Sequence, residues 1–268
     1  MALPSFYTPS YSTEQQEVVL DEDNSRHVVQ VLRMKRGEFL QLTDGRGHLV
    51  EGEIADAHKK QCLVAVRKVL TAPPPSANVT IAISPLKNAS RFEWFLEKAT
   101  EIGVRSIIPL LCERTERQSI RTDRLRNILV SAMLQSQQVW LPSLPEPQLF
   151  SQVLTHVPGA TPWGAATTAE VRLIAHCLEA PRATAMLTDV IRKPTNPATE
   201  ADAATISTAT SAEAADAGTL ILIGPEGDFS PKEVEAALAA GYLPVSLGAN
   251  RLRTETAGVV AATLLCIK

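Results

Sequence analysis

The chain has 268 residues, 45% of them hydrophobic, which is enough for a sizeable core in one or two domains. Its formal net charge of -3 excludes a globally basic protein, so any contact with nucleic acid must come from local patches. Four widely spaced cysteines, no basic and apolar leader, and no run near the roughly 18 apolar residues of a membrane span predict a cytoplasmic protein without a metal centre.

Residues 17–70 are predicted to form a small β-rich domain, because several short apolar runs recur there at a spacing typical of barrels. A helix is expected over residues 27–33, capped by Asp23 or Asn24. The Asp-Gly-Arg-Gly run at 44–47 is typical of a hairpin turn. The expected strands cover 18–20, 39–42, 48–54 and 62–66.

Two basic clusters stand out. The first has no acidic residue among positions 24–36, so it can anchor phosphates, although a solvated surface explains it equally well. It consists of Arg26, Arg33, Lys35 and Arg36. The second is interleaved with acidic residues and indicates either another phosphate-contacting surface or the salt-bridged start of a helix over 123–139. It consists of Arg114, Arg117, Arg121, Arg124 and Arg126.

A proline-rich run at 71–76 predicts a stiff linker, so we place the domain boundary there, with domains at 1–72 and 73–268. In the second domain a capping box at Ser90 begins a helix that ends at Gly103. Buried strands are expected at 79–83, 106–111 and 171–177.

Residues 194–217 are rich in Ala, Thr, Ser, Asp and Glu and contain no Lys or Arg. This composition predicts a disordered surface insertion. Before it, His176 stands at the carboxyl end of a predicted strand, where a structural role and a role facing a ligand are both open.

The strongest local pattern begins with a predicted buried strand at 220–223. Gly224 and Gly227 then allow a sharp turn, and Ser230 caps a helix that Gly241 ends. A strand, a glycine turn and a capped helix together mark the ligand-binding edge of an open α/β sheet. An ordinary strand-to-helix corner can look the same, and the glycine spacing is not that of a dinucleotide or triphosphate loop.

The last segment contains a short strand at 244–248 and an apolar helix around 259–265. That helix is apolar on nearly every side, so we expect it to be buried on more than one face. Burial of a chain end indicates a subunit interface or a tail threaded through the fold.

The run GPEGDFSPKEVEAAL from Gly224, followed by LGANRLRTETA from Leu247, resembles the 16S ribosomal RNA (uridine-N3) methyltransferase family of the SPOUT superfamily. The resemblance covers nearly the whole chain. It implies an α/β fold in which a trefoil-knotted parallel-sheet methyltransferase domain follows an N-terminal PUA-like, RNA-binding β-barrel. It also implies a homodimer that acts on 16S rRNA in the small ribosomal subunit. We expect the first basic cluster, Arg26, Arg33, Lys35 and Arg36, to bind that RNA through its phosphates.

The same resemblance implies S-adenosylmethionine as the cofactor. Its binding residues would be Ile223, Gly224, Pro225, Gly227, Leu247, Gly248, Leu252 and Arg253. For the chemistry, Arg253 is expected to polarise a uracil carbonyl, and Glu255 to accept the imide proton or to orient Arg253. A buried ion pair between these two residues that merely pins the last helix is the alternative.

Two features depart from the family pattern. Residues 134–138 read Leu-Gln-Ser-Gln-Gln where the family often has Glu-Gln-Ser-Gly-Arg, so a basic contact to RNA is absent or supplied elsewhere. The insertion at 194–217 is also longer than expected. Two other functions stay open: a non-catalytic RNA-binding module, which would not need the glycine turns, and an α/β enzyme that acts on a small metabolite.

Overall fold

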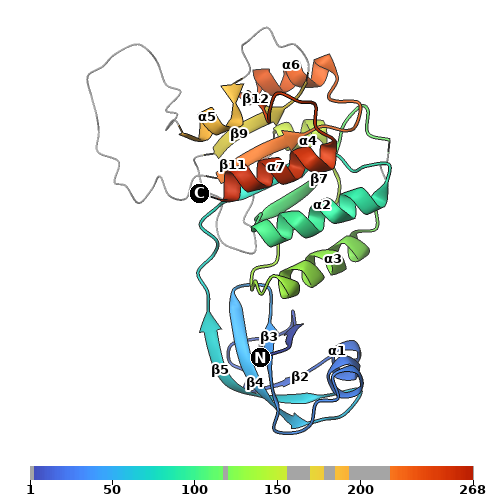
Figure 1. Cartoon of the computed structure of the whole chain (residues 1–268), viewed down its shortest axis with the longest axis vertical. Coiled ribbons are helices and arrows are strands. Elements are labelled where there is room, and N and C mark those ends of the chain that lie inside the picture. The colour runs from blue at the N-terminus through green and yellow to red at the C-terminus, as the bar shows by residue number, and fades with distance from the viewer. Residues whose placement is uncertain (1–2, 117–119, 156–169, 178–184, 193–217, 268) are drawn as a thin grey trace, which may run out of the picture. The chain divides into compact units, whose positions relative to one another are not determined.

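The computed structural model describes the chain except for residues 1–2, 117–119, 156–169, 178–184, 193–217 and 268 (Figure 1). The described residues form two compact units, and each is described by itself. The first unit contains residues 1–74 and 130–141, and the second contains residues 75–129 and 142–268. The predicted insertion at 194–217 and Arg117 lie outside the described residues.

The first unit is built on a five-stranded sheet in the order β1-β3-β4-β5-β2. Its strands pair antiparallel except for β1 and β3, which are parallel. Alternate residues of the strands point into one apolar core, which includes Leu40, Leu42, Val50 and Val64. The elements are β1 (Ser5–Tyr7), β2 (Glu17–Val19), α1 (Glu22–Arg26), η1 (His27–Val31), β3 (Phe39–Thr43), β4 (His48–Asp56) and β5 (Leu63–Thr71).

The four strands and the hairpin expected in this unit are confirmed, and β1 is an addition that the sequence did not indicate. The Asp44 carboxylate shapes the hairpin, since its Oδ1 accepts from the Arg46 amide at 2.8 Å. The prediction of a helix over 27–33 was wrong about where the helix starts and about its type. It begins at Glu22 because Asp21 caps it, accepting from the Asn24 amide at 2.8 Å, and it continues as a π-helix from His27.

The second unit contains a seven-stranded sheet in the order β10-β12-β9-β11-β6-β7-β8. Every pair in it is parallel, which confirms the predicted parallel-sheet α/β class. The predicted knot stays a prediction. The elements are β6 (Val79–Ile83), α2 (Ala89–Ile102), β7 (Ser106–Leu111), α3 (Thr122–Gln135), β8 (Gln148–Leu149), α4 (Phe150–Leu154), β9 (Glu170–Ala175), β10 (Ala185–Met186), α5 (Leu187–Arg192), β11 (Gly218–Ile223), α6 (Pro231–Ala239), β12 (Leu243–Ser246) and α7 (Thr254–Cys266). The last turns of α3, from Val130 on, belong to the first unit.

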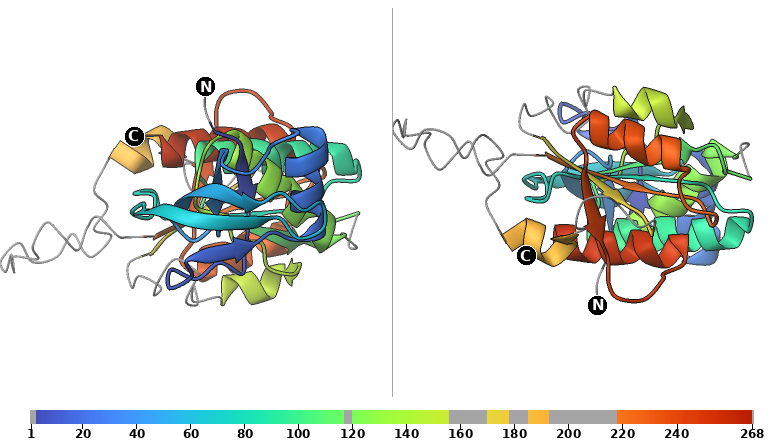
Figure 2. Two further views of the ribbon diagram at one scale, coloured as in Figure 1. Left: turned by 90° about the horizontal axis from the view of Figure 1, so that it is seen from below. Right: turned by 90° about the horizontal axis from the view of Figure 1, so that it is seen from above.

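Helices cover both faces of this sheet (Figure 2). On one face α4 and α6 close a core that contains Phe150, Phe229 and Tyr242, and the Tyr242 hydroxyl donates to the Val153 carbonyl at 3.2 Å. On the other face α2 packs against α7. The sheet is therefore covered by helices on both faces, as all-parallel sheets usually are.

Two predicted helix ends needed correction. The cap of α2 is Asn88 rather than Ser90, because the Asn88 side chain accepts from the Ser90 amide at 3.0 Å. The α3 helix stops at Gln135 instead of residue 139, and Gln137 just beyond it has a left-handed φ of 57°. The predicted ends of α2 at Gly103, with a φ of 96°, and the capping box of α6 at Ser230 are confirmed.

Helix α7 is buried on one face rather than on several. Gly258, Ala261, Ala262 and Leu265 are buried on the same side of the helix, whereas Thr263 is exposed. Burial of a further face, which we expected from a subunit interface or a threaded tail, stays a prediction. The uncovered side, which includes the half-buried Val259, Val260 and Leu264, is available to another surface.

Candidate active site

A cavity of about 360 Å³ lies at the carboxyl ends of β9 and β11, next to the chain that leads into α7. This is the edge at which parallel α/β sheets bind their ligands, and the volume falls in the range of small-molecule sites, roughly 300–1,000 Å³. The lining residues are Arg91 from α2, Ala175 at the end of β9 and Cys177 after it, Ile223 at the end of β11 followed by Gly224, Pro225, Glu226 and Asp228, and Arg251, Leu252 and Arg253 before α7 with Thr254 and Ala257 in its first turn.

The turn after β11 is fixed to the beginning of α7. The Gly224 carbonyl accepts a hydrogen bond from Thr254 Oγ1 at 3.1 Å. Gly224 itself must be small, because a Cβ there would lie 3.0 Å from the Phe229 ring and 3.2 Å from the Phe229 nitrogen. The two motifs that are 30 residues apart in the sequence therefore form one continuous wall.

Asp228 joins the turn to the end of β9. Its Oδ2 accepts from the Cys177 amide at 2.9 Å, and its Oδ1 accepts from the amide of Phe229 at 2.8 Å. Its backbone has a left-handed φ of 62°, a conformation that Asp tolerates better than most residues with a side chain. Asp228 thus ties the segment after β11 to the segment after β9 at the cavity wall.

A charged cluster formed by Arg91, Glu226 and Glu255 lies beside the cavity. Arg91 Nη1 is 3.5 Å from Glu226 Oε1, and Arg91 Nε is 3.7 Å from Glu255 Oε1. Glu255 is only 6% exposed, and its Oε2 is buried with no hydrogen-bond partner among the described residues. A buried carboxylate oxygen without a partner is costly, so this acceptor is the most unusual polar atom at the site.

Contrary to the expectation from the sequence, Arg253 forms no ion pair with Glu255. Its side chain is exposed at the cavity, and neither it nor Arg251 has an ion-pair partner among the residues that the structure describes. The alternative of a buried Arg253–Glu255 ion pair is therefore wrong: Arg91 is the arginine that faces Glu255. The Arg253 carbonyl accepts from the Ala257 amide at 2.8 Å, which fixes its backbone at the start of α7.

Five of the eight residues predicted to bind the cofactor line the cavity: Ile223, Gly224, Pro225, Leu252 and Arg253. The other three, Gly227, Leu247 and Gly248, do not line it. The Gly227 carbonyl accepts from Arg114 Nη1 at 2.8 Å, while Leu247 and Gly248 follow β12. Roles for all eight stay predictions. Sequence reasoning missed Arg91, Asp228 and Cys177, and their types and spacing gave no signal of a shared site.

His176 lies between two residues of the cavity wall but is not part of the lining. Both of its ring nitrogens are buried and without a hydrogen-bond partner in the described part of the chain. Its structural and ligand-facing interpretations therefore both stay open.

The first basic cluster lies in the first unit, where Arg26, Arg33, Lys35 and Arg36 are exposed. Arg26 Nη2 is paired with Glu22 Oε1 at 2.9 Å, just outside the acid-free stretch. The cluster therefore offers about one charge fewer to a ligand than the sequence indicates. Its function stays a prediction.

The second basic cluster is divided in the structure. Arg114 donates to the Gly227 carbonyl, and Arg124 binds Glu93 through two hydrogen bonds of 2.7 and 2.9 Å. The ion pair of Arg124 at the start of α3 agrees with the salt-bridge interpretation, whereas Arg114 binds a backbone carbonyl, which neither interpretation predicted. Arg121 is exposed and has no carboxylate partner among the described residues.

Among the described residues, no group of His, Cys, Asp and Glu side chains could hold a metal ion. In the same part of the chain, no helix has both the length and the apolar character that crossing a bilayer requires.

Comparison with protein families matches residues 73–266 to an RNA methyltransferase domain and residues 20–67 to an RNA methyltransferase PUA domain. Ribosomal RNA small subunit methyltransferase E of Synechocystis sp. is 30% identical over 248 residues, which cover 91% of this chain and 71% of that protein.

Two solved structures share this fold over nearly their whole length. A probable rRNA methyltransferase from Porphyromonas gingivalis has a TM-score of 0.78 and 39% identity, with 98% of both chains covered. Ribosomal RNA small subunit methyltransferase E from Neisseria gonorrhoeae, solved bound to S-adenosyl methionine, has a TM-score of 0.76 and 25% identity, with 98% of this chain and 96% of that one covered.

Proposed function

The chain belongs to the ribosomal RNA small subunit methyltransferase E family of RNA methyltransferases, and we propose that it transfers a methyl group from S-adenosylmethionine to N3 of one uridine in 16S rRNA. The observation that best supports this proposal is the cavity at the ends of β9 and β11. Its two principal walls are the two sequence motifs that resemble the family, and Gly224 and Thr254 join them.

The residues present fit S-adenosylmethionine. The apolar side chains of Ile223, Leu252 and Ala257 offer surface to an adenine ring, and the main chain of the turn that begins at Gly224 lines the cavity and offers polar groups. Glu226 and Asp228 place negative charge beside a sulfonium cation, to which they are attracted. When bound, this cofactor supplies an electrophilic methyl group.

The reaction forms a bond from N3 to the methyl carbon, breaks the bond from sulfur to that carbon, and releases the imide proton of uracil. Arg253 is exposed at the cavity and has no carboxylate partner among the residues that the structure describes, so it can hold a uracil carbonyl and stabilise the developing imide anion. We propose Glu255 as the proton acceptor, because its Oε2 has no other partner among the described residues. Arg91, whose Nε lies 3.7 Å from Glu255 Oε1, positions the Glu255 carboxylate.

Transfer of labelled methyl from S-adenosylmethionine to RNA tests this function. Unmodified small-subunit rRNA should accept label, and large-subunit rRNA should not. Presenting the small-subunit RNA both free and in assembled subunits identifies the form that the enzyme uses. Absence of transfer to either form, with cofactor present, would contradict the proposed activity.

Cys177 provides a prediction for the cofactor cavity. It is exposed on the lining, whereas Cys62 and Cys112 are buried and burial raises the pKa of both thiols. Burial also raises the pKa of the Cys266 thiol to about 11. A raised pKa leaves little reactive thiolate near pH 8, so iodoacetamide should label Cys177 first.

Saturating S-adenosylmethionine should slow the labelling of Cys177 severalfold, as followed by peptide mass spectrometry. A Cys177→Ser variant is the control that identifies background labelling. Equal labelling rates with and without the cofactor would place the cofactor away from this cavity.

The first basic cluster gives a prediction about RNA binding. Alanine in place of all four of its residues should weaken binding to small-subunit RNA and lower the salt dependence, by about 0.7–0.9 units of slope for each lost phosphate contact. We expect the slope to fall by an amount that corresponds to about three lost phosphate contacts rather than four, because Arg26 is paired with Glu22. Lys59 and Lys60, exposed on the same unit between β4 and β5, serve as the matched control when both are changed to alanine. If the fourfold variant binds RNA with unchanged affinity and unchanged salt dependence, the cluster does not contact RNA and is only a solvated surface.

We also propose that the protein acts in the cytoplasm as a homodimer in which a second copy covers the uncovered side of α7. Val259, Val260 and Leu264 are apolar and half-buried on that side, which supports an additional contact. Sedimentation at micromolar protein should give a dimer, and Val260→Glu should shift it toward the monomer. A wild-type protein that sediments as a monomer at all concentrations would exclude this arrangement.

A further inference from the structure

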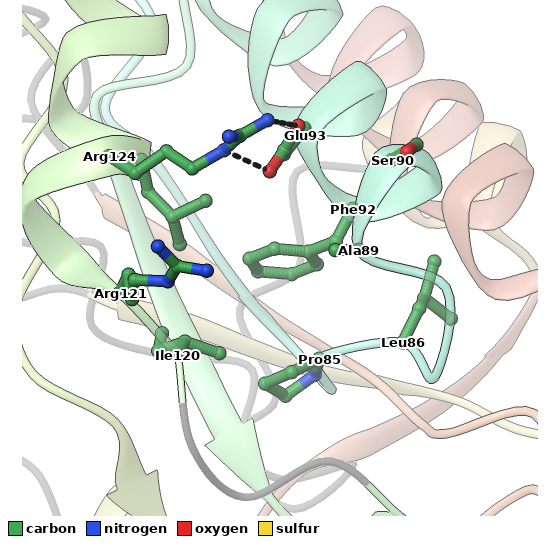
Figure 3. Close-up of a pocket in the computed structure, with 10 residues that line it drawn as sticks. Pro85, Leu86, Ala89, Ser90, Phe92, Glu93, Ile120, Arg121 and Arg124 are labelled. Atoms are coloured by element: carbon green, nitrogen blue, oxygen red, sulfur yellow. Dashed lines mark hydrogen bonds and ion pairs between the residues drawn. The ribbon is translucent and has the colours of Figure 1, made fainter.

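A second cavity, of about 250 Å³, opens at the first turn of α2 in the same unit (Figure 3). Pro85 and Leu86, which follow β6, form its base. Ser90 and Phe92 line it, while Arg91 between them lines the first cavity, so the two cavities share this turn of the helix. The remaining lining residues are Ala89, Glu93, Ile120, Arg121, Arg124 and Leu125.

The walls of this cavity combine apolar side chains with a guanidinium group that has no carboxylate partner in the described part of the chain. Phe92 is 3% exposed, and Figure 3 shows its ring turned into the cavity opposite Ile120, with Pro85 below. The guanidinium group of Arg121 points toward the Phe92 ring. The Arg124 charge is neutralised by the two hydrogen bonds to Glu93, so Arg121 is the lining arginine that has no carboxylate partner among the described residues.

We infer that this second cavity binds a nucleotide of the RNA that flanks the methylated uridine. The guanidinium plane of Arg121 is a surface of the kind on which proteins stack unpaired bases, and the buried Phe92 ring forms an apolar wall of the cavity. Arg121 has no carboxylate partner among the described residues, so its charge can also bind the adjoining phosphate. The volume is below the usual range of cofactor sites, roughly 300–1,000 Å³, and suits a single base. The Arg124–Glu93 pair offers donors and acceptors to the edge of that base.

This inference rests on the proposed function, because it needs an RNA with its target base in the first cavity. Both cavities open at the same turn of α2, so neighbouring nucleotides of a splayed strand enter on either side of Arg91. A base that leaves its stack must be held elsewhere, and the second cavity holds the neighbour of the target. The site therefore selects a strand in which two bases can be unstacked together.

Two variants test the second cavity by different means. Arg121→Glu reverses the exposed charge, and Ala89→Trp fills the space from a half-buried position at the start of α2. Arg126→Glu is the matched control, since Arg126 is exposed on the same helix as Arg124 and does not line the cavity. The substrate is unmodified small-subunit rRNA, and the measurements are kcat/KM for RNA and the thermal shift that S-adenosylmethionine produces.

Each cavity variant should lower kcat/KM for RNA by about fivefold to a hundredfold, the size expected for the loss of one stacked base. The thermal shift with cofactor should be unchanged, which shows that the variants are folded, and Arg126→Glu should stay within about twofold of wild type. Wild-type kcat/KM in both cavity variants would overturn the inference and leave the proposed function intact. Wild-type enzyme that methylates no RNA would overturn both.

Discussion

Arg253→Ala is expected to lower kcat by about a hundredfold to a thousandfold, because loss of one donor that stabilises a developing oxyanion typically has this effect. The side chain is exposed at the cavity and has no ion-pair partner among the described residues, so its removal should leave the fold intact. Single-turnover methylation with saturating cofactor and RNA measures the effect on the chemical step.

Cofactor binding by Arg253→Ala is the companion measurement. A ligand at one hundred times its dissociation constant stabilises a protein by roughly 2.7 kcal/mol, so a melting-point shift should persist in the variant. Arg251→Ala is the matched control, since Arg251 is also exposed on the cavity lining. Equal losses in both variants would indicate a general effect of positive charge on RNA binding. Wild-type turnover in Arg253→Ala would remove Arg253 from the chemistry.

Gly258→Val is expected to destabilise the second unit strongly. A Cβ at Gly258 would lie 2.5 and 2.7 Å from the Phe95 ring and 2.8 Å from Ile83 Cδ1. Phe95 and Ile83 are fully buried, so neither can move aside without disturbing the contact of α7 with α2 and β6. Overpacking of this kind costs about 1–3 kcal/mol or more, and a β-branched side chain belongs at the upper end.

Urea denaturation followed by circular dichroism measures the loss of stability in Gly258→Val. Thr263→Val is the control, because it places the same side chain on the exposed side of α7, where a change within about 0.5 kcal/mol is expected. Gly258→Val as stable as wild type would show that α7 packs less closely on α2 than the structure describes.

Local chemistry explains what the sequence predicted well. The turn from Gly224, the Ser230 cap and the end of α2 at Gly103 follow from residues within a few positions of each other. The same reasoning failed at α1 and α2, where Asp21 and Asn88 compete with other good caps nearby. Propensity does not decide between neighbouring capping residues, because the start of a helix also depends on what its first turn packs against.

The site is harder to predict because it depends on contacts between distant segments. Arg91 is an ordinary arginine in the first turn of an amphipathic helix, and only the approach of α2 to α7 places it beside Glu255. The sequence paired Glu255 with Arg253, its near neighbour, but on a helix residues two positions apart do not face each other. Arg114 and Arg124 similarly resemble RNA contacts until the structure shows the carbonyl and carboxylate that they bind.

Mass mapping of methylated nucleosides is the measurement that tests the central claim most directly. Unmodified 16S rRNA is incubated with the purified protein and S-adenosylmethionine, digested to nucleosides and oligonucleotides, and analysed by tandem mass spectrometry. The account predicts a single 3-methyluridine at one position, absent without cofactor and strongly reduced with Arg253→Ala. A methyl group found instead on uracil C5, on a ribose 2′-oxygen or on another base would contradict it.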